Sequence, residues 1–406
     1  MEFRLAIAEA LCATPGWDGA FTAEETAAML EAPPNPDMGD FAFPCFKLAR
    51  TMRKAPPLIA ADLAGRIVLP AGVARVEALS GYLNFTLDRA ALSRAVLERI
   101  AHEGDRYGGS DVGGGRCVCI DYSSVNIAKP LHIGHLPSTV IGNALYRIYN
   151  HLGYRSVGIN HLGDWGTQFG KMIYAYKTWG SREAVERGGV DELVRLYVRF
   201  HQEAENDEAM NDAARAWFRR IEEGDAEATN LFNWFKEITL SEVQQVFDLM
   251  DIRFDSYAGE SFYNDKMGRV VDELRQKGLL KLDQGAQIVD LSAYKMPPCI
   301  ILRSDGATLY ATRDIAAALY RKDTYDFAKC LYVVAYQQSL HFRQWFKVVE
   351  LMGYPWAKDL VHVAFGMVSG TDGAFSTRRG NMVKLRHATY KYGTLETLYA
   401  HLSQLC

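Results

Sequence analysis

Residues 120–135 read Ile-Asp-Tyr-Ser-Ser-Val-Asn-Ile-Ala-Lys-Pro-Leu-His-Ile-Gly-His. An apolar β-branched run that includes Val118 leads into this stretch, and a helix-like segment follows from Thr139. A strand that ends where a helix begins directs backbone N–H groups and the positive end of the helix dipole at one place, which suits a phosphate. The stretch therefore predicts a strand–turn–helix unit that can hold a phosphate group.

Three residues of this turn favour a nucleotide as the ligand. The imidazoles of His132 and His135 can donate to phosphoryl oxygens as charge grows in a transition state. Gly134 lets a nucleotide come close to the backbone, where a side chain would block it. Zinc is a poorer candidate, because His-x-x-His lacks the glutamate and the i, i+4 spacing of zinc-protease helices. Two ordinary histidines at a helix N-terminus are the structural alternative.

The composition describes a large, well-packed chain. Its 406 residues are enough for two or three domains. With 49% hydrophobic residues and a net charge of −4, it can bury a sizeable core but has no global basic field, so any RNA contact must use local patches. Seven cysteines form no C-x-x-C pair, and the sequence shows no signal-peptide pattern and no run of 18 apolar residues. We expect a cytoplasmic protein with free thiols and no membrane contact.

From residue 117 onward, short apolar runs alternate with helical patterns, which indicates βα units and a parallel sheet. The expected strands are 117–122, 155–160, 331–336 and 360–367, and the expected helices are 138–151, 165–178, 313–322 and 340–352. Between about 180 and 255 the pattern is wholly helical, and we interpret this stretch as a helical insertion whose aromatic residues are core. Cys117 and Cys119 alternate on one strand face and are also expected in the core.

Residues 1–110 predict a separate small domain, joined to the strand at 117 by a glycine-rich linker. In it we expect a helix at 45–54, a strand at 82–87 and a helix at 89–101. The basic residues of the first helix are Lys47, Arg50, Arg53 and Lys54. A solvated charged face is the ordinary explanation for them, and a patch for an RNA backbone is the functional one.

Polar motifs also follow the later strands, where βα units place their ligands. Asn160–Gly170 is rich in glycine around an Asp and a Trp, and Gln337–Phe342 stands at a strand-to-helix turn. Tyr310 and Asp314 lie four residues apart; if the helix began near Thr312, Asp314 would lie in its first turn and could merely complement the helix dipole. The segment 366–383 is a basic loop bounded by glycines, which suits a polyphosphate.

Five motifs follow one another along the chain. They are H-I-G-H at 132–135, H-L-G-D-W-G-T-Q-F-G at 161–170, Y-x-x-x-D at 310–314, Q-S-L-H-F at 338–342 and S-T-R-R-G at 376–380. Together they resemble the arginyl-tRNA synthetases, which are class I aminoacyl-tRNA synthetases, and the last is similar to that family's KMSKS loop. G-D-F-A-F-P and G-Y-L-N-F resemble the family's N-terminal add-on domain, which contacts the tRNA elbow.

The resemblance implies a fold and a domain order. It implies an α/β class I synthetase fold, in which a small α+β N-terminal domain precedes a Rossmann-type parallel sheet with a helical insertion. The add-on domain is expected at 1–110, the catalytic domain at 111–385 with its insertion at about 180–255, and an atypical tail at 386–406. The tail does not resemble the family's anticodon-binding domain, so we expect a truncated or frame-altered product that charges tRNA weakly. Full-length relatives are usually monomers, whereas exposed apolar surface predicts self-association here.

The resemblance also implies an arginine–tRNA ligase, which makes arginyl-adenylate from L-arginine and ATP and then arginylates the 3′-terminal adenosine of tRNA(Arg). The expected catalytic residues are His132, His135 and Lys129, where Lys129 stands in for the lysine missing from the phosphate loop. The expected ATP-binding residues are these three with Gly134, Ser376, Thr377, Arg378 and Arg379, and Mg²⁺ is expected to neutralise the remaining phosphate charge. The expected arginine-binding residues are Asp121, Ser124, Val125, Asn126, His135, Tyr310, Asp314 and Gln338. The basic residues at 47–54 are the expected tRNA contact.

Two departures from the family pattern leave alternatives open. Pro137 stands where the family usually has Arg, which removes a cation and an N–H but is tolerated in a first helical turn. Val125 replaces a common Pro. Another class I synthetase or a small-molecule adenylating relative is one alternative. A synthetase-like fragment that binds ATP, arginine or tRNA without efficient turnover is the other.

Overall fold

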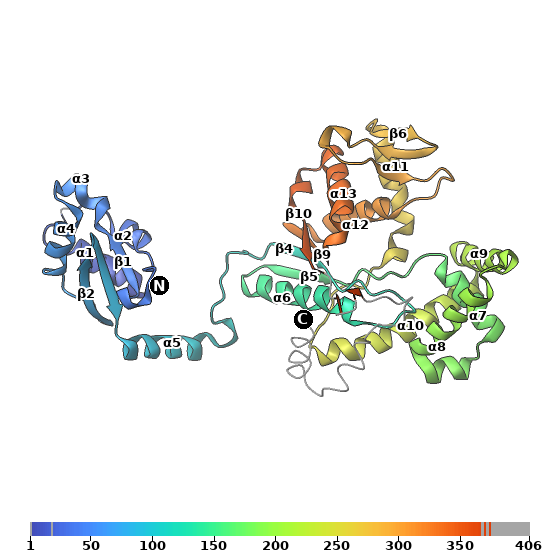
Figure 1. Cartoon of the computed structure of the whole chain (residues 1–406), viewed down its shortest axis with the longest axis horizontal. Helices are drawn as coiled ribbons and strands as arrows, with labels where there is room; N and C mark the ends of the chain where they lie inside the picture. The colour runs from blue at the N-terminus through green and yellow to red at the C-terminus, as the bar shows by residue number, and fades with distance from the viewer. Residues whose placement is uncertain (1, 18, 367–368, 371–372, 375–406) are drawn as a thin grey trace. The chain divides into compact units, whose positions relative to one another are not determined.

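The computed structural model describes residues 2–17, 19–366, 369–370 and 373–374. The chain divides into two compact units, Met1–Gly108 and Gly109–Cys406 (Figure 1). The predicted phosphate loop, Ser376–Arg379, and the predicted tail at 386–406 lie outside the described residues. No helix in the part of the chain that the structure describes is long and apolar enough to cross a membrane.

The first unit is a three-stranded antiparallel sheet covered by helices. Its strands are β1 (Phe41–Pro44), β2 (Val73–Leu79) and β3 (Tyr82–Leu87), in the order β1-β3-β2. Its longer helices are α1 (Glu2–Cys12), α2 (Ala23–Met29), α4 (Pro56–Ala64) and α5 (Arg89–Glu103). Trp17, Phe43 and Phe85 are buried at its centre. The predicted strand at 82–87 and helix at 89–101 are confirmed.

The predicted helix at about 45–54 is only partly confirmed. The segment forms a 3₁₀ turn, η2 (Cys45–Leu48), and one α-turn, α3 (Ala49–Met52). It stops at Arg53, whose φ of 50° is left-handed, and Ala55 is extended because Pro56 follows it. The four basic residues therefore do not share one helix face, and Lys54 lies 3.5 Å from Asp62 in an exposed ion pair.

The second unit contains the predicted parallel sheet. Its strands are β4 (Cys117–Asp121), β5 (Arg155–Ile159), β9 (Lys329–Ala335) and β10 (Leu360–Phe365), in the order β10-β9-β4-β5. The helices that follow them are α6 (Leu136–His151), α7 (Gln168–Trp179), α12 (Tyr310–Tyr325) and α13 (Ser339–Leu351). All eight elements are confirmed to within a few residues. Because the strands run parallel, their carboxyl ends share one edge.

The alternation of β4 divides the interior into two cores. Val118 and Ile120 face a core that continues into the helical insertion, whereas Cys117 and Cys119 face a core with Val157 and the helices α12 and α13. The predicted burial of both cysteines is confirmed, and both β4 faces are covered, as is usual for a parallel sheet.

The insertion consists of three long helices packed at one end of the second unit (Figure 1). They are α8 (Arg182–Glu203), α9 (Glu208–Glu222) and α10 (Ala226–Leu249). Phe235 and Phe247 are buried, as predicted for core aromatic residues. Trp217, Phe218 and Trp234 are only partly buried and pack against the same core.

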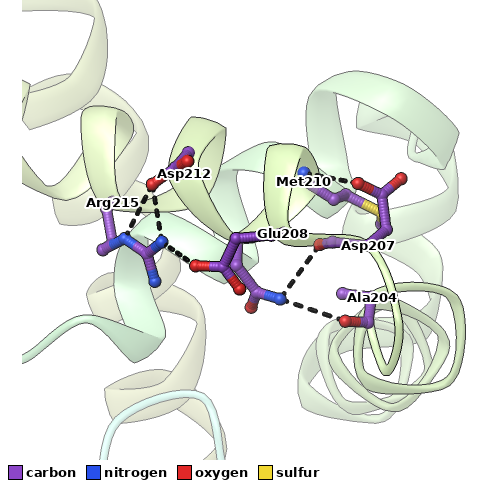
Figure 2. A network of polar contacts seen from close by, with 7 residues as sticks. Ala204, Asp207, Glu208, Met210, Asp212 and Arg215 are labelled. Carbon is purple, nitrogen blue, oxygen red and sulfur yellow. Dashed lines mark hydrogen bonds and ion pairs between the residues drawn. The ribbon is translucent and has the colours of Figure 1, made fainter.

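Side chains fix the turn into α9 (Figure 2). The Asp207 carboxylate caps the helix by accepting the Met210 N–H at 3.0 Å, and Arg215 contacts Glu208 and Asp212. The Asn211 side-chain amide donates to the carbonyls of Ala204 and Asp207, at 3.0 and 3.1 Å. The insertion is therefore held by local polar contacts as well as by its core.

The sequence analysis missed an antiparallel sheet between the insertion and α12. Its strands are β6 (Leu280–Asp283), β7 (Ala286–Val289) and β8 (Cys299–Leu302), and α11 (Met267–Gln276) precedes them. The missed signal is the two-residue turn Gln284-Gly285, whose φ values of 47° and 84° suit a hairpin. A short pair, β11 (Ser369–Gly370) and β12 (Gly373–Ala374), ends the described part of the chain.

Candidate active site

The loop after β4 is strained and firmly held. Ser123 and Ser124 adopt left-handed φ values of 70° and 50°, which are costly for residues with a Cβ and gather at functional sites. The Ser123 N–H donates to the Ser138 hydroxyl at 2.9 Å, and that hydroxyl donates to the Val333 carbonyl at 2.6 Å. The loop, the first turn of α6 and the end of β9 are thus fastened together at the carboxyl edge of the sheet.

Asp121, the last residue of β4, forms a buried ion pair with Arg321 of α12. The Arg321 Nη2 lies 2.7 Å from Asp121 Oδ2, and the Ser124 hydroxyl donates to Asp121 Oδ1 at 3.1 Å. Arg321 is 1% exposed. The sequence analysis missed Arg321, although its place two helical turns after Asp314 puts both residues on one face of α12.

These groups line one small cavity of about 90 Å³. Its polar lining is Asp121, Ser124, His161, Asp314, Arg321 and Tyr332. Burial lowers the pKa of His161, so this imidazole is held neutral. The structure therefore brings the predicted Asp121, Ser124 and Asp314 into the lining of one cavity, with the Arg321 guanidinium paired to Asp121.

Asp314 also contacts His341 at the start of α13, with His341 Nε2 2.6 Å from Asp314 Oδ2. α12 begins at Tyr310 and not near Thr312, so Asp314 lies beyond the first turn and does not complement the helix dipole. The reason is that Leu309 is extended and already acts as the N-cap. Asp314 is thus placed by the cavity and by His341.

The Tyr310 side chain lines a different and larger hollow of about 880 Å³. It is 67% exposed, and its neighbours there include Trp165, Asn264 and Arg313. The predicted Tyr310–Asp314 pair therefore does not line one cavity: the two side chains lie in different hollows along α12.

The two histidines of the H-I-G-H turn pack against each other with ring centroids 4.0 Å apart. His132 Nδ1 accepts the Gly134 N–H at 3.1 Å, and His135 Nδ1 accepts the His132 N–H at 3.2 Å. Since each Nδ1 accepts, each ring carries its proton on Nε2 and presents a donor there. Burial lowers the pKa of both, that of His135 to about 3, and Lys129 adds to the shift. Both rings are neutral donors near pH 7.

The loop after β4 and the H-L-G-D loop are joined by backbone bonds. The Gly163 N–H donates to the Val125 carbonyl at 2.9 Å, and the Ile127 N–H donates to the Gly163 carbonyl at 3.1 Å. Val125 is buried, whereas Asn126 and Lys129 are exposed. These bonds hold the predicted substrate-binding segment at 124–126 against the second glycine-rich motif.

Gln338 and Pro137 stand at the starts of two helices on the same edge. Gln338 is exposed and is the N-cap residue of α13. Pro137 lies in the first turn of α6, which forms without a break, so the expected tolerance of the fold is confirmed.

A second buried polar cluster lies beside the larger hollow. Asp164 is 0% exposed; it pairs with Lys236 at 2.5 Å and accepts the Ser261 N–H and hydroxyl at 2.9 and 2.7 Å. Glu260 lies 3.5 Å from Arg313, and burial raises the pKa of Glu260 to about 7. The sequence analysis noted only the glycine-rich motif around Asp164 and missed these ion pairs, whose partners are distant in sequence.

Known proteins resemble this chain in both sequence and fold. Residues 97–389 match the family model for class I (R) tRNA synthetases, catalytic domain, and residues 1–87 match the arginyl tRNA synthetase N terminal domain. The arginine–tRNA ligase of Clostridioides difficile is 57% identical over 365 residues, which are 90% of this chain and 64% of that protein. That of Alkaliphilus metalliredigens is 55% identical over 361 residues, 89% of this chain and 64% of that protein. The chain thus spans about two thirds of the length of these relatives.

Solved structures show the same fold. Thermus thermophilus arginyl-tRNA synthetase matches with a TM-score of 0.68 and 23% identity, over 96% of this chain and 69% of that chain. The Plasmodium falciparum enzyme matches with a TM-score of 0.62 and 21% identity, over 93% of this chain and 66% of that chain. The family model covers most of the chain, including every described motif of the site. The chain therefore belongs to the class I arginyl-tRNA synthetase family.

Proposed function

We propose that this chain carries the catalytic part of an arginine–tRNA ligase, which activates L-arginine with ATP and transfers the arginyl group to tRNA(Arg). The observation that carries the proposal is the cavity that holds Asp121 and Asp314 at the same sheet edge as the histidine pair. An acidic socket suits a guanidinium, and neutral imidazole donors suit a triphosphate.

Arginine is bound through its planar guanidinium. Asp314 supplies the carboxylate for a forked, two-bond contact, which the compact ammonium of lysine cannot reproduce. Tyr310 lies one helical turn before Asp314. From the larger hollow, its ring is assigned to cover the side chain of the bound arginine. The amino acid's polar head is assigned to Ser124, Val125 and Asn126, with Gln338 facing the same edge.

ATP is bound at the turn into α6. The Nε2–H groups of His132 and His135 donate to phosphoryl oxygens, Gly134 leaves room for the nucleotide, and Lys129 supplies positive charge. The α6 N-terminus adds its dipole. Ser376, Thr377, Arg378 and Arg379 are assigned to the β- and γ-phosphates. Mg²⁺ enters as part of the ATP substrate, because this ion is held largely by phosphate oxygens.

The reaction needs position and charge more than covalent help from the protein. A carboxylate oxygen of arginine attacks the α-phosphorus, the bond to the bridging β-oxygen breaks, and pyrophosphate leaves. The 2′-hydroxyl of the terminal adenosine then attacks the acyl carbon, and AMP leaves as arginyl-tRNA forms. The histidine donors oppose the negative charge that grows on the phosphoryl oxygens in the first step.

The tRNA elbow is assigned to the first unit, with Lys47, Arg50, Arg53 and Lys54 as backbone contacts. We place the activity in the cytoplasm, because all six cysteines in the described residues are free thiols, as a reducing compartment keeps them.

The test is arginine-dependent exchange of pyrophosphate into ATP by the full chain, with tRNA present. We expect exchange with arginine and not with lysine or citrulline. Asp314→Asn should reduce kcat/KM for arginine by roughly 30-fold or more, because a charged hydrogen bond to the substrate is lost. Asp251→Asn, in an exposed ion pair with Arg147, is the matched control. Exchange that depends on another amino acid, or none at all, would refute the proposal.

A further inference from the structure

Arg321 is the feature of the site that the proposed reaction does not use. No other arginine or lysine among the described residues is as deeply buried. Its guanidinium lies 2.7 Å from Asp121, 3.4 Å from His161 Nδ1 and 5.4 Å from the centre of the Tyr332 ring. A permanent cation thus stands inside a cavity that is proposed to receive the cation of the substrate.

The charges of the side chains that line the cavity almost balance. Asp121 and Asp314 are the two acidic residues of its lining, and Arg321 is the one basic residue that stays protonated at any accessible pH. Burial lowers the pKa of His161, so its imidazole adds no charge to this lining. One negative charge remains in excess, which matches a single guanidinium.

We infer that Arg321 is a specificity-determining positioning residue: it cancels the charge of Asp121, so that the cavity accepts one monovalent guanidinium at Asp314. The inference rests on the proposed function. Two uncompensated carboxylates in so small a cavity would repel each other. Arg321 prevents this, and it also fixes Asp121 with one oxygen toward α12 and the other toward Ser124.

The inference makes a charge prediction that a purely structural ion pair does not make. Asp121→Asn leaves Arg321 uncompensated and removes the excess negative charge, so arginine should be repelled. The double variant Asp121→Asn/Arg321→Met restores the excess of one negative charge and should bind arginine again. Citrulline is the neutral isostere of arginine, so its affinity should be the same in both variants as in the wild type.

The experiment is calorimetric titration of the full chain with L-arginine and with citrulline at pH 8. We expect Asp121→Asn to lower arginine affinity by roughly 30-fold or more, and the double variant to recover at least about tenfold of it. Citrulline affinity should stay within about threefold throughout, as for sites that do not couple. Arg147→Met is the control, because it removes an exposed arginine that pairs with Asp251 at 2.6 Å. It should change the affinity for neither arginine nor citrulline.

A double variant as weak for arginine as Asp121→Asn would overturn the inference, since Asp121 would then act by direct contact. If Asp121→Asn fails to fold, the double variant decides alone. If the ratio of its arginine affinity to its citrulline affinity is within about tenfold of the wild-type ratio, the inference is supported. A fall of roughly 30-fold in that ratio overturns the inference. A wild-type chain that does not bind arginine would overturn the proposed function, and the inference with it. A wild type that binds arginine beside a failed double variant would overturn the inference alone.

Discussion

Asp164 and Lys236 join the loop after β5 to the middle of α10, with Lys236 Nζ 2.5 Å from Asp164 Oδ2. The carboxylate has no exposed surface and also accepts two hydrogen bonds from Ser261. One side chain of the H-L-G-D motif therefore holds the helical insertion and the segment before α11 in place. The motif supports the walls of the site through this contact.

Asp164→Asn should destabilise the chain. The amide removes the charge partner of Lys236 and cannot accept the same set of bonds, and breaking a buried pair costs about 3–5 kcal/mol. Lys236 is partly exposed, which lets it reach water, so we expect about 2–3 kcal/mol. Urea unfolding measures the change. Asp323→Asn, in an exposed pair with Arg269, should cost under about 1 kcal/mol and is the control. Equal effects of the two variants would contradict the anchoring role.

Gly170→Ala should destabilise the insertion. A Cβ at Gly170 would meet the Ala214 carbonyl and lie 2.8 Å from the Phe218 backbone nitrogen, so α7 and α9 would have to move apart. Backbone atoms cannot yield as a flexible side chain does, and we expect a loss of about 2–4 kcal/mol.

Gly268→Ala is the matched control, since nothing lies within 4 Å of its Cβ position in α11. Alanine is the better helix former there and should stabilise by about 0.5–1 kcal/mol. Thermal unfolding of both variants gives the comparison. A neutral Gly170→Ala would mean that α7 and α9 do not pack this closely.

His135 should make the chain less stable as pH falls. Its folded pKa of about 3 lies below the 6.5 of the free side chain, so between these values the unfolded chain binds a proton that the folded chain does not. The stability that depends on the neutral ring is present above pH 6.5 and is lost as the pH falls below it. His135→Asn should reduce the loss between pH 7 and pH 5 by about 1–2 kcal/mol in urea unfolding. His102 is exposed, and His102→Asn should leave the loss of stability between pH 7 and pH 5 unchanged.

Glu260 should act in the opposite direction. Its folded pKa of about 7 lies above the usual 4.5, so between these values the folded chain holds a proton that the unfolded chain has released. The stability that depends on the protonated Glu260 is fully present below pH 4.5 and is lost as the pH rises through 7. Glu260→Gln cannot ionise and should lose about 2 kcal/mol less stability between pH 5 and pH 8. Glu203→Gln, in an exposed pair with Arg199, should follow wild type.

The sequence by itself determined the βα framework and the edge at which the site lies. Apolar runs and helical periods depend on neighbouring residues, and they located β4, β5, β9 and β10 to within a few residues. Strands that run parallel must end at one edge, so the motifs that follow them had to come together. The break at Arg53 and the hairpin at Gln284-Gly285 were local signals that the periodic pattern obscured.

Only the tertiary structure decided which charges meet. Arg321 and Asp121 are 200 residues apart, and Lys236 and Asp164 are 72 apart. These pairs depend on how α12 and α10 pack and rotate against the sheet, which no local pattern records. The same packing sends Tyr310 into the larger hollow and Asp314 into the smaller one, although they are one helical turn apart. Side-chain direction around a helix changes by about 100° per residue, so a small rotation of α12 settles which cavity each side chain enters.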